Sequence, residues 1–472
     1  MRGKLAGFIV AAVCFATAQS ASAADMPAKA PVYKAPMAAA TPWTGFYVNG
    51  GIGYGMWAAD TTDSVPATGT CGFCETQVQG GKGWLATLGA GYDYQFAPKI
   101  IAGLFGEASI SSLKGTVQDR AIPGQGEIKQ TSSWAAGGRI GWLVTPQTLS
   151  YVNGGYTAAR FSDTNLGNFI SGAPSGFSTP GFTANGWFLG GGVEASVAPN
   201  WFWRTEYRYA YYGNKVIAES PAFLDINFKP TVQTVTSQIV YKFNGGMPAP
   251  VYPATPTMAT NWTGFYANAG AGYGVWNAST TQGAAGTGVC LICATQTVGG
   301  KGYLGVVGAG YDWQFAPAWV AGVFGDFDIA SLKGTIQDQV LGDSGTIKQT
   351  SAWAVGPRLG WLPSPQTMTY VNGGYTGARF SGANMVSMIS GGPTGVTTGS
   401  FTASGWFVGG GVETTFDLFG MLGKGWFWRN EYRYASYGNK TVTDSIGGVP
   451  VVDIAFKPTV QTVTSQVVFK FN

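Results

Sequence analysis

The stretch Gly83–Pro98, GWLATLGAGYDYQFAP, is the clearest indication of how this chain folds. Its side chains alternate between two kinds. One set is apolar or aromatic and comprises Trp84, Ala86, Leu88, Ala90, Tyr92, Tyr94 and Phe96. The other set is small or polar and comprises Thr87, Gly89, Gly91, Asp93 and Gln95. Because successive side chains of a β-strand point to opposite faces, the alternation predicts one long strand with an apolar face and a polar face.

The same stretch returns 219 residues later as Gly302–Pro317, GYLGVVGAGYDWQFAP. The correspondence extends to both ends of the repeat. The entry segment WTGFY occurs at Trp43–Tyr47 and Trp262–Tyr266, and the closing segment Phe228–Asn244 returns as Phe456–Asn472. Solenoid repeats have periods of about 20–50 residues, so a repeat of this length predicts two complete folds.

The composition indicates which solvent surrounds these folds. Charged residues make up 11% of the chain, aromatic residues 14%, and histidine is absent. Ordinary soluble domains have roughly 25% charged residues. Beyond Thr17 no apolar run is long enough for a transmembrane helix, and the 73 glycines disfavour helices in general. An exported protein built of strands is therefore expected.

Eight alternating segments occur in each copy. In the first copy they lie near residues 44–57, 82–96, 100–113, 129–143, 148–161, 182–197, 201–213 and 229–243. Short turns such as Ala97–Lys99 alternate with four long loops rich in Gly, Ser, Thr and Asp. This arrangement is typical of transmembrane up-and-down β-barrels, which have short periplasmic turns and long extracellular loops.

A water-soluble β-sandwich is the alternative, and it would bury the aromatic face and expose the charged one. A barrel in lipid has the opposite polarity, with aromatic girdles at both membrane interfaces and polar groups in its lumen. Trp84 stands at one end of the opening strand, and Tyr94 and Phe96 stand at the other. This placement favours the barrel, because soluble folding gives no reason for it.

The face assigned to the lumen collects equal numbers of acidic and basic residues in each copy. The first copy has Asp93, Glu107, Glu194 and Glu206 with Arg139, Arg204, Arg208 and Lys242. The second copy has Asp312, Asp326, Glu413 and Glu431 with Arg358, Arg429, Arg433 and Lys470. The interior of an eight-stranded barrel is just wide enough to be filled by side chains, and buried charges must be paired. We therefore expect a lumen charge network that plugs the barrel.

Two arrangements of the sixteen strands remain open. In the first, each copy closes as its own eight-stranded barrel, and the protein has a structural role. In the second, the copies merge into one sixteen-stranded barrel that conducts small solutes like a porin. Balanced interior charge and a separate entry segment in each copy favour the first arrangement.

The chain divides into five segments on these grounds. Arg2 and Lys4 precede the apolar run Leu5–Thr17, and small residues end at Ala23, as in a secretory signal peptide. We expect a signal peptide at 1–23, a Pro/Ala-rich periplasmic lead at 24–42, the first outer-membrane barrel repeat at 43–244, a Pro-rich periplasmic linker at 245–261 and the second repeat at 262–472.

No catalytic constellation is apparent, because histidine, the most common general base, is missing. Each copy has one Cys-x-x-Cys motif in its first long loop, formed by Cys71 and Cys74 and by Cys290 and Cys293. In an exported protein we expect local disulfides. A thioredoxin-type site would need a βαβ context, and a zinc site would need the two loops to meet. We expect no cofactor, no metal and no nucleic-acid partner.

The chain resembles the small outer-membrane β-barrel proteins of alpha-proteobacteria that are described as surface immunogens or porin-family proteins. The resemblance rests on Ala24–Pro27, Trp43–Tyr47, Gly91–Asp93, Trp203–Tyr207 and Tyr241–Phe243. It implies an eight-stranded barrel in each copy, here duplicated in tandem, in the outer membrane of a Gram-negative cell. It also implies a non-enzymatic role in envelope integrity, adhesion or immune contact. The implied partners are outer-membrane lipid, lipopolysaccharide and the barrel-assembly machinery.

Overall fold

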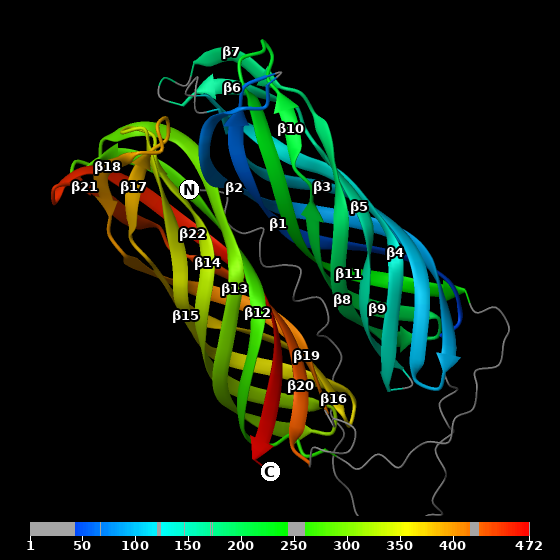
Figure 1. Ribbon diagram of the computed structural model, residues 1–472. Helices are drawn as coiled ribbons and strands as arrows, with labels where there is room; N and C mark the ends of the chain where they lie inside the picture. The colour runs from blue at the N-terminus through cyan, green and yellow to red at the C-terminus, as the bar shows by residue number, and fades with distance from the viewer. Residues whose placement is uncertain are drawn as a thin grey trace, which may run out of the picture. The chain divides into compact units, whose positions relative to one another are not determined.

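The structure is a computed structural model that describes residues 43–66, 68–119, 124–145, 147–169, 171, 173–243, 260–415 and 424–471 (Figure 1). Twenty-two strands occur in this part of the chain, and the neighbouring strands pair in antiparallel fashion. A search of the same residues for a helix long and apolar enough to cross a membrane finds none. The predicted signal peptide and lead, and all but the last residues of the linker, lie outside the described residues.

Eight strands of the first copy form a closed ring. They are β1 Gly45–Ser64, β2 Cys71–Ala97, β3 Ile100–Asp119, β4 Gly124–Thr145, β5 Thr148–Phe161, β8 Phe182–Ala198, β9 Trp201–Tyr212 and β11 Asp225–Phe243. Each pairs with the next in this order. The first and last strands also pair, from Phe46 opposite Phe243 to Ser64 opposite Asp225. This final pairing leaves the ring without an edge.

The second copy closes in the same way. Its ring strands are β12 Gly264–Ala284, β13 Cys290–Ala316, β14 Trp319–Asp338, β15 Asp343–Ser364, β16 Thr367–Phe380, β19 Phe401–Thr415, β20 Trp426–Tyr437 and β22 Val449–Phe471. Here β12 pairs with β22, and Phe265 lies opposite Phe471. Since Phe265 and Phe46 are equivalent in the repeat, both rings close in the same register.

The polarity predicted for the opening strand is confirmed. Trp84 and Leu88 are 60% and 71% exposed on the outside of the ring, whereas Thr87 and Asp93 are 5% and 0% exposed inside it. The same face of β3 exposes Leu104 at 73%. Large apolar side chains therefore cover the outer face, as a barrel surrounded by lipid requires.

The strands extend further than the alternation predicts, and this corrects the expected loops. β1 continues to Ser64 and β2 begins at Cys71, so Cys71 opens a strand instead of lying in a long loop. Cys290 likewise opens β13. Alternation weakens here because both faces become polar or small. The backbone ladder nevertheless continues, since it depends on hydrogen bonds between neighbouring strands and not on side-chain polarity.

The remaining long connections are also built of strands. In the first copy these strands are β6 Thr164–Asn168, β7 Pro174–Thr179 and β10 Lys215–Ala218, which gather at one end of the ring (Figure 1). In the second copy they are β17 Ala383–Ser387, β18 Pro393–Thr398 and β21 Lys440–Ile446. With four to seven residues each, they are too short to produce a clear alternation signal in the sequence. The end that carries them is the extracellular end in the barrel plan.

Candidate functional site: the lumen charge network

Five charged side chains of the first barrel meet in one cluster near the end of the ring that carries the short turn between β2 and β3. Arg139 on β4 donates from Nε and Nη2 to the two carboxylate oxygens of Asp93 on β2, at 2.8 and 2.5 Å. Its Nη1 donates to Glu194 on β8 at 2.9 Å. Glu194 also accepts from Nε of Arg204 on β9 at 2.9 Å. Lys242 on β11 lies 2.7 Å from Asp93 and 3.0 Å from Glu194. The cluster therefore joins five of the eight strands of the ring.

A second group of ion pairs lies next to this cluster. Arg208 on β9 donates to Glu107 on β3 at 2.9 Å and to Glu206 on its own strand at 2.5 Å. The other oxygen of Glu206 accepts from the Tyr151 hydroxyl at 2.7 Å and from the Asn153 amide at 2.8 Å. All eight lumen residues predicted for the first copy thus take part in ion pairs across the interior.

The second barrel repeats the arrangement with its own eight residues, Asp312, Asp326, Arg358, Glu413, Arg429, Glu431, Arg433 and Lys470. Arg358 pairs with Asp312 and, at 3.1 Å, with Glu413. The position of Glu107 is occupied by the shorter Asp326. Arg433 compensates by donating to both oxygens of Asp326, at 2.9 and 2.6 Å.

Aromatic residues of the lumen were missed in the sequence, because aromatic side chains were assigned to the membrane interfaces. The ring of Tyr47 lies 4.7 Å from the guanidinium carbon of Arg139 and 4.9 Å from that of Arg204. Trp43 lies 4.4 Å from Nζ of Lys242. Each geometry allows a cation–π interaction. The signal that could have found Tyr47 is its parity, since odd-numbered positions of β1 face inward.

The lumen above the ion pairs is filled by apolar side chains. Trp57, Phe161, Phe182 and Phe228 are buried and pack ring against ring. Trp57 has room because glycine lies beside it: a Cβ on Gly81 would come within 2.2 Å of the indole. These contacts leave little open space along the axis of the first barrel.

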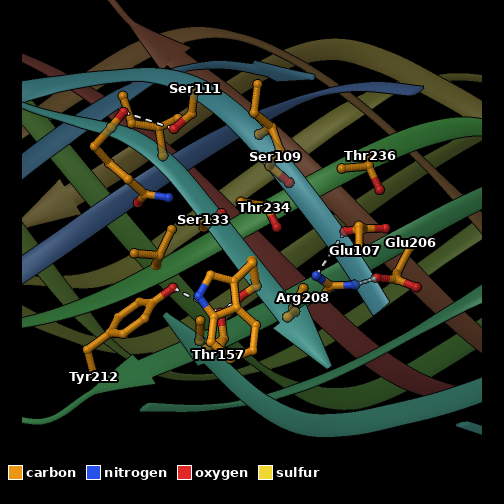
Figure 2. A pocket seen from close by; sticks show the side chains of 17 residues that line it. Glu107, Ser109, Ser111, Ser133, Thr157, Glu206, Arg208, Tyr212, Thr234 and Thr236 are labelled. Atoms are coloured by element: carbon orange, nitrogen blue, oxygen red, sulfur yellow. Dashed lines mark hydrogen bonds and ion pairs between the residues drawn. The ribbon is translucent and has the colours of Figure 1, made fainter. Parts of the chain in front are cut away.

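Figure 2 draws the residues around one cavity of the first barrel, which has a volume of about 30 Å³. Glu107, Ser109, Arg208, Thr236 and Tyr212 are among its lining residues. A water molecule needs at least about 10–15 Å³ of such space, so the cavity has room for water but not for a larger solute. Figure 2 also shows the ion pairs of Arg208 with Glu107 and Glu206 at the side of the cavity.

The cysteine motif of the second copy forms a disulfide between Cys290 and Cys293. In the first copy Cys71 is disulfide-bonded, and the side chain of Cys74 lies outside the described residues. Among the residues that the structure describes, no group of three or more Cys, Asp or Glu side chains is arranged to hold a metal ion.

A closed antiparallel ring with an apolar outer face and an interior filled by paired charges defines the class of outer-membrane β-barrel proteins. The chain belongs to the family of the outer membrane protein beta-barrel domain, which matches residues 8–243. It is similar to the 31 kDa outer-membrane immunogenic protein of Brucella melitensis, with 27% identity over 50% of this chain and 98% of that protein. The 25 kDa outer-membrane immunogenic protein of Brucella abortus is 28% identical over 50% of this chain and 96% of its own length.

Two solved structures have detectable similarity of fold. Outer membrane protein OprG of Pseudomonas aeruginosa is 16% identical and covers 44% of this chain and 99% of its own, with a TM-score of 0.30. A FadL homologue from the same organism is 10% identical and covers 91% of both chains, with a TM-score of 0.26.

Proposed function

We propose that this protein is a non-enzymatic component of the outer membrane, in which two separate eight-stranded barrels anchor strand-built extracellular hairpins at the cell surface. The role would be structural or antigenic, in line with the names of the immunogenic relatives. The observation that carries the proposal is the pairing of the first strand with the last within each copy.

That pairing matters because a merged sixteen-stranded barrel would need β1 to pair with β22 and β11 to pair with β12. In the structure β1 pairs with β11 and β12 pairs with β22, in each case along nearly the whole strand. Backbone N–H and C=O groups in lipid must all be hydrogen-bonded. Opening both rings would therefore cost free energy unless every hydrogen bond lost between β1 and β11 and between β12 and β22 re-formed in the larger ring.

The filled lumen supports a non-conducting role. Asp93, Glu194 and Lys242 are 0%, 0% and 1% exposed, so ions and solutes do not reach them. A pore that selects ions would keep its charged groups in contact with water. In this barrel the charges are instead satisfied by one another across the interior.

Planar-bilayer recording on the full-length mature protein tests the proposal. We expect no steady channels, because ion pairs cross both lumens and aromatic side chains fill them, with Trp276, Phe380 and Phe456 in the second barrel equivalent to Trp57, Phe161 and Phe228 in the first. Steady single-channel currents of nanosiemens size would overturn the proposal and favour the porin alternative. As a control, the same preparation should contain folded protein, shown by gel migration that changes on heating.

A second test concerns the first copy alone. If residues 24–244 form a complete barrel, this segment should insert into vesicles without the second copy and show the same heat-dependent migration. A segment that inserts only in the presence of residues 262–472 would instead support the sixteen-stranded alternative.

A further inference from the structure

Each barrel has a buried pair of carboxyl groups that the lumen charge network does not use. In the second barrel the pair is Asp338, the last residue of β14, and Asp444 in β21. In the first barrel it is Asp119, the last residue of β3, and Glu219, which follows β10. The four side chains are 0%, 0%, 0% and 4% exposed. Offsets of 219 and 225 residues relate Asp119 to Asp338 and Glu219 to Asp444, so both copies have the pair.

The pairs lie outside the apolar band of the barrel. On the outer face of β14, Val323 and Ile329 are 60% and 69% exposed, and the next large side chain on that face is the exposed Lys333. Charged residues mark the end of the lipid-facing band in barrels of this class. The strand from Lys333 to Asp338 therefore stands in the extracellular part of the barrel.

The contacts of the second pair leave one oxygen of each carboxyl group facing the other. Oδ1 of Asp338 accepts the backbone N–H groups of Val340 and Leu341 at 2.9 and 3.0 Å. Oδ1 of Asp444 accepts the Thr398 hydroxyl at 2.5 Å. Among the described residues no donor reaches Oδ2 of either group, and the two carboxyl groups lie within hydrogen-bonding reach of each other. Two buried carboxylates at this distance do not both ionise, but one proton between them gives each Oδ2 a partner.

The equivalent site in the first barrel differs from this one. Glu219 lies within hydrogen-bonding reach of Asp119, but Asp119 also has a further interaction partner there. Among the described residues, the other charged group acting on Asp338 and Asp444 is Asp343, which is also acidic. Burial, together with these carboxylates, raises the pKa of Asp444 to about 7.

The pair connects separate hairpins at the mouth of the barrel. Asp338 ends the first strand of the β14–β15 hairpin, and Thr398 ends β18. Thr398 lies opposite Asp444 of β21 in the β18–β21 pairing. Figure 1 shows β17, β18 and β21 together at one end of the second ring. A change in charge at this point therefore acts on three hairpins at once.

We propose that Asp338 and Asp444 share one proton, and that this proton holds the extracellular hairpins together over the mouth of the second barrel. Loss of the proton places two negative charges in a buried site, and their repulsion separates the hairpins. The closed mouth binds the proton more tightly than an open mouth does. Closure is therefore strongest in acid and weakens as the pH rises through about 7.

A proton explains the site better than a divalent cation does. Calcium takes about six to eight oxygen ligands, whereas two carboxyl groups and a hydroxyl meet here. If a cation bridged the pair, a chelator would open the mouth even in acid. If a proton bridges the pair, the mouth stays closed in acid whether or not chelator is present. This difference separates the two explanations.

Hydrogen exchange of the full-length mature protein in detergent micelles, read by mass spectrometry, tests the proposal. After correction for the intrinsic pH dependence of exchange, peptides covering Val340 and Leu341 should lose protection by about tenfold for each pH unit above the closed-state pKa. Peptides from the lipid-facing part of β14 should keep their protection. Chelator at pH 5 should have no effect.

Isosteric amides provide the variants, because they cannot lose the shared proton. Asp444→Asn should remove the pH dependence of protection at Val340 and Leu341. Asp163→Asn, at an exposed carboxyl of the first barrel, should keep the normal profile. The proposal is overturned if the unmodified protein shows no pH dependence, if Asp444→Asn retains it, or if chelator reproduces the loss of protection at pH 5.

Discussion

Lys242 and Asp93 lie 149 residues apart in the chain, and their side chains meet inside the first barrel, with Nζ of the lysine 2.7 Å from Oδ2 of the aspartate. One residue is on the closing strand β11 and the other on β2. Both are buried. The ion pair therefore ties the last strand of the ring to the second strand across the lumen.

Lys242→Met should destabilise the first barrel by about 3–5 kcal/mol, because it leaves buried carboxylates without one of their cations. Urea unfolding of the full-length protein in lipid vesicles can be followed by tryptophan fluorescence. The transition of the first barrel should move to a lower urea concentration than in the unmodified protein, and the transition of the second barrel should stay unchanged. The double variant Lys242→Met with Asp93→Asn should recover part of the loss, since it removes one carboxylate as well. An unchanged midpoint for the single variant would show that the pair does not stabilise the barrel.

The lipid-facing position Leu88 should not tolerate a charge. Leu88→Arg should cost about 2–4 kcal/mol if the residue lies near the midplane of the bilayer. Val216→Arg provides a matched control, because Val216 is 51% exposed on β10, outside the apolar band. Folding yield in vesicles measures the difference. Equal yields for the two variants would contradict the lipid-facing assignment of Leu88.

Gly81 should not tolerate a methyl group, because its Cβ would come within 2.2 Å of the Trp57 indole. We expect Gly81→Ala to cost about 1–3 kcal/mol by overpacking. Gly106→Ala is the control, since no atom lies within 4 Å of the Cβ position there. Urea unfolding in vesicles distinguishes them. If both variants unfold like the unmodified protein, the lumen is less closely packed than the structure indicates.

The disulfide between Cys290 and Cys293 should protect both thiols from alkylation. In denatured protein that has not been reduced, mass spectrometry should find no alkyl group on the peptide containing them. After reduction it should find two. Alkylation without reduction would contradict the disulfide, and the thiols would then be free at the start of β13.

Much of the fold could be predicted from particular residues. Leu88 and Thr87 differ in polarity and are neighbours in a strand, so their opposite faces follow from the pleat. Val216 and Thr398 were not predicted to lie in strands, because β10 and β18 contain only four and six residues. Strands of this length are too short to show an alternation of apolar and polar residues. They form because the neighbouring strands offer hydrogen-bonding partners to their backbone groups.

The duplication, the membrane-facing polarity and the inward parity of residues such as Asp93 and Arg139 are all legible in the sequence. These properties follow from the order of residues along each strand. The folded ring is needed to see that Arg139 holds Asp93 and Glu194 together, and that Asp338 meets Asp444 at the mouth. Such contacts join strands far apart in the chain, and they depend on how the ring closes and on the stagger of its strands, which no local pattern encodes.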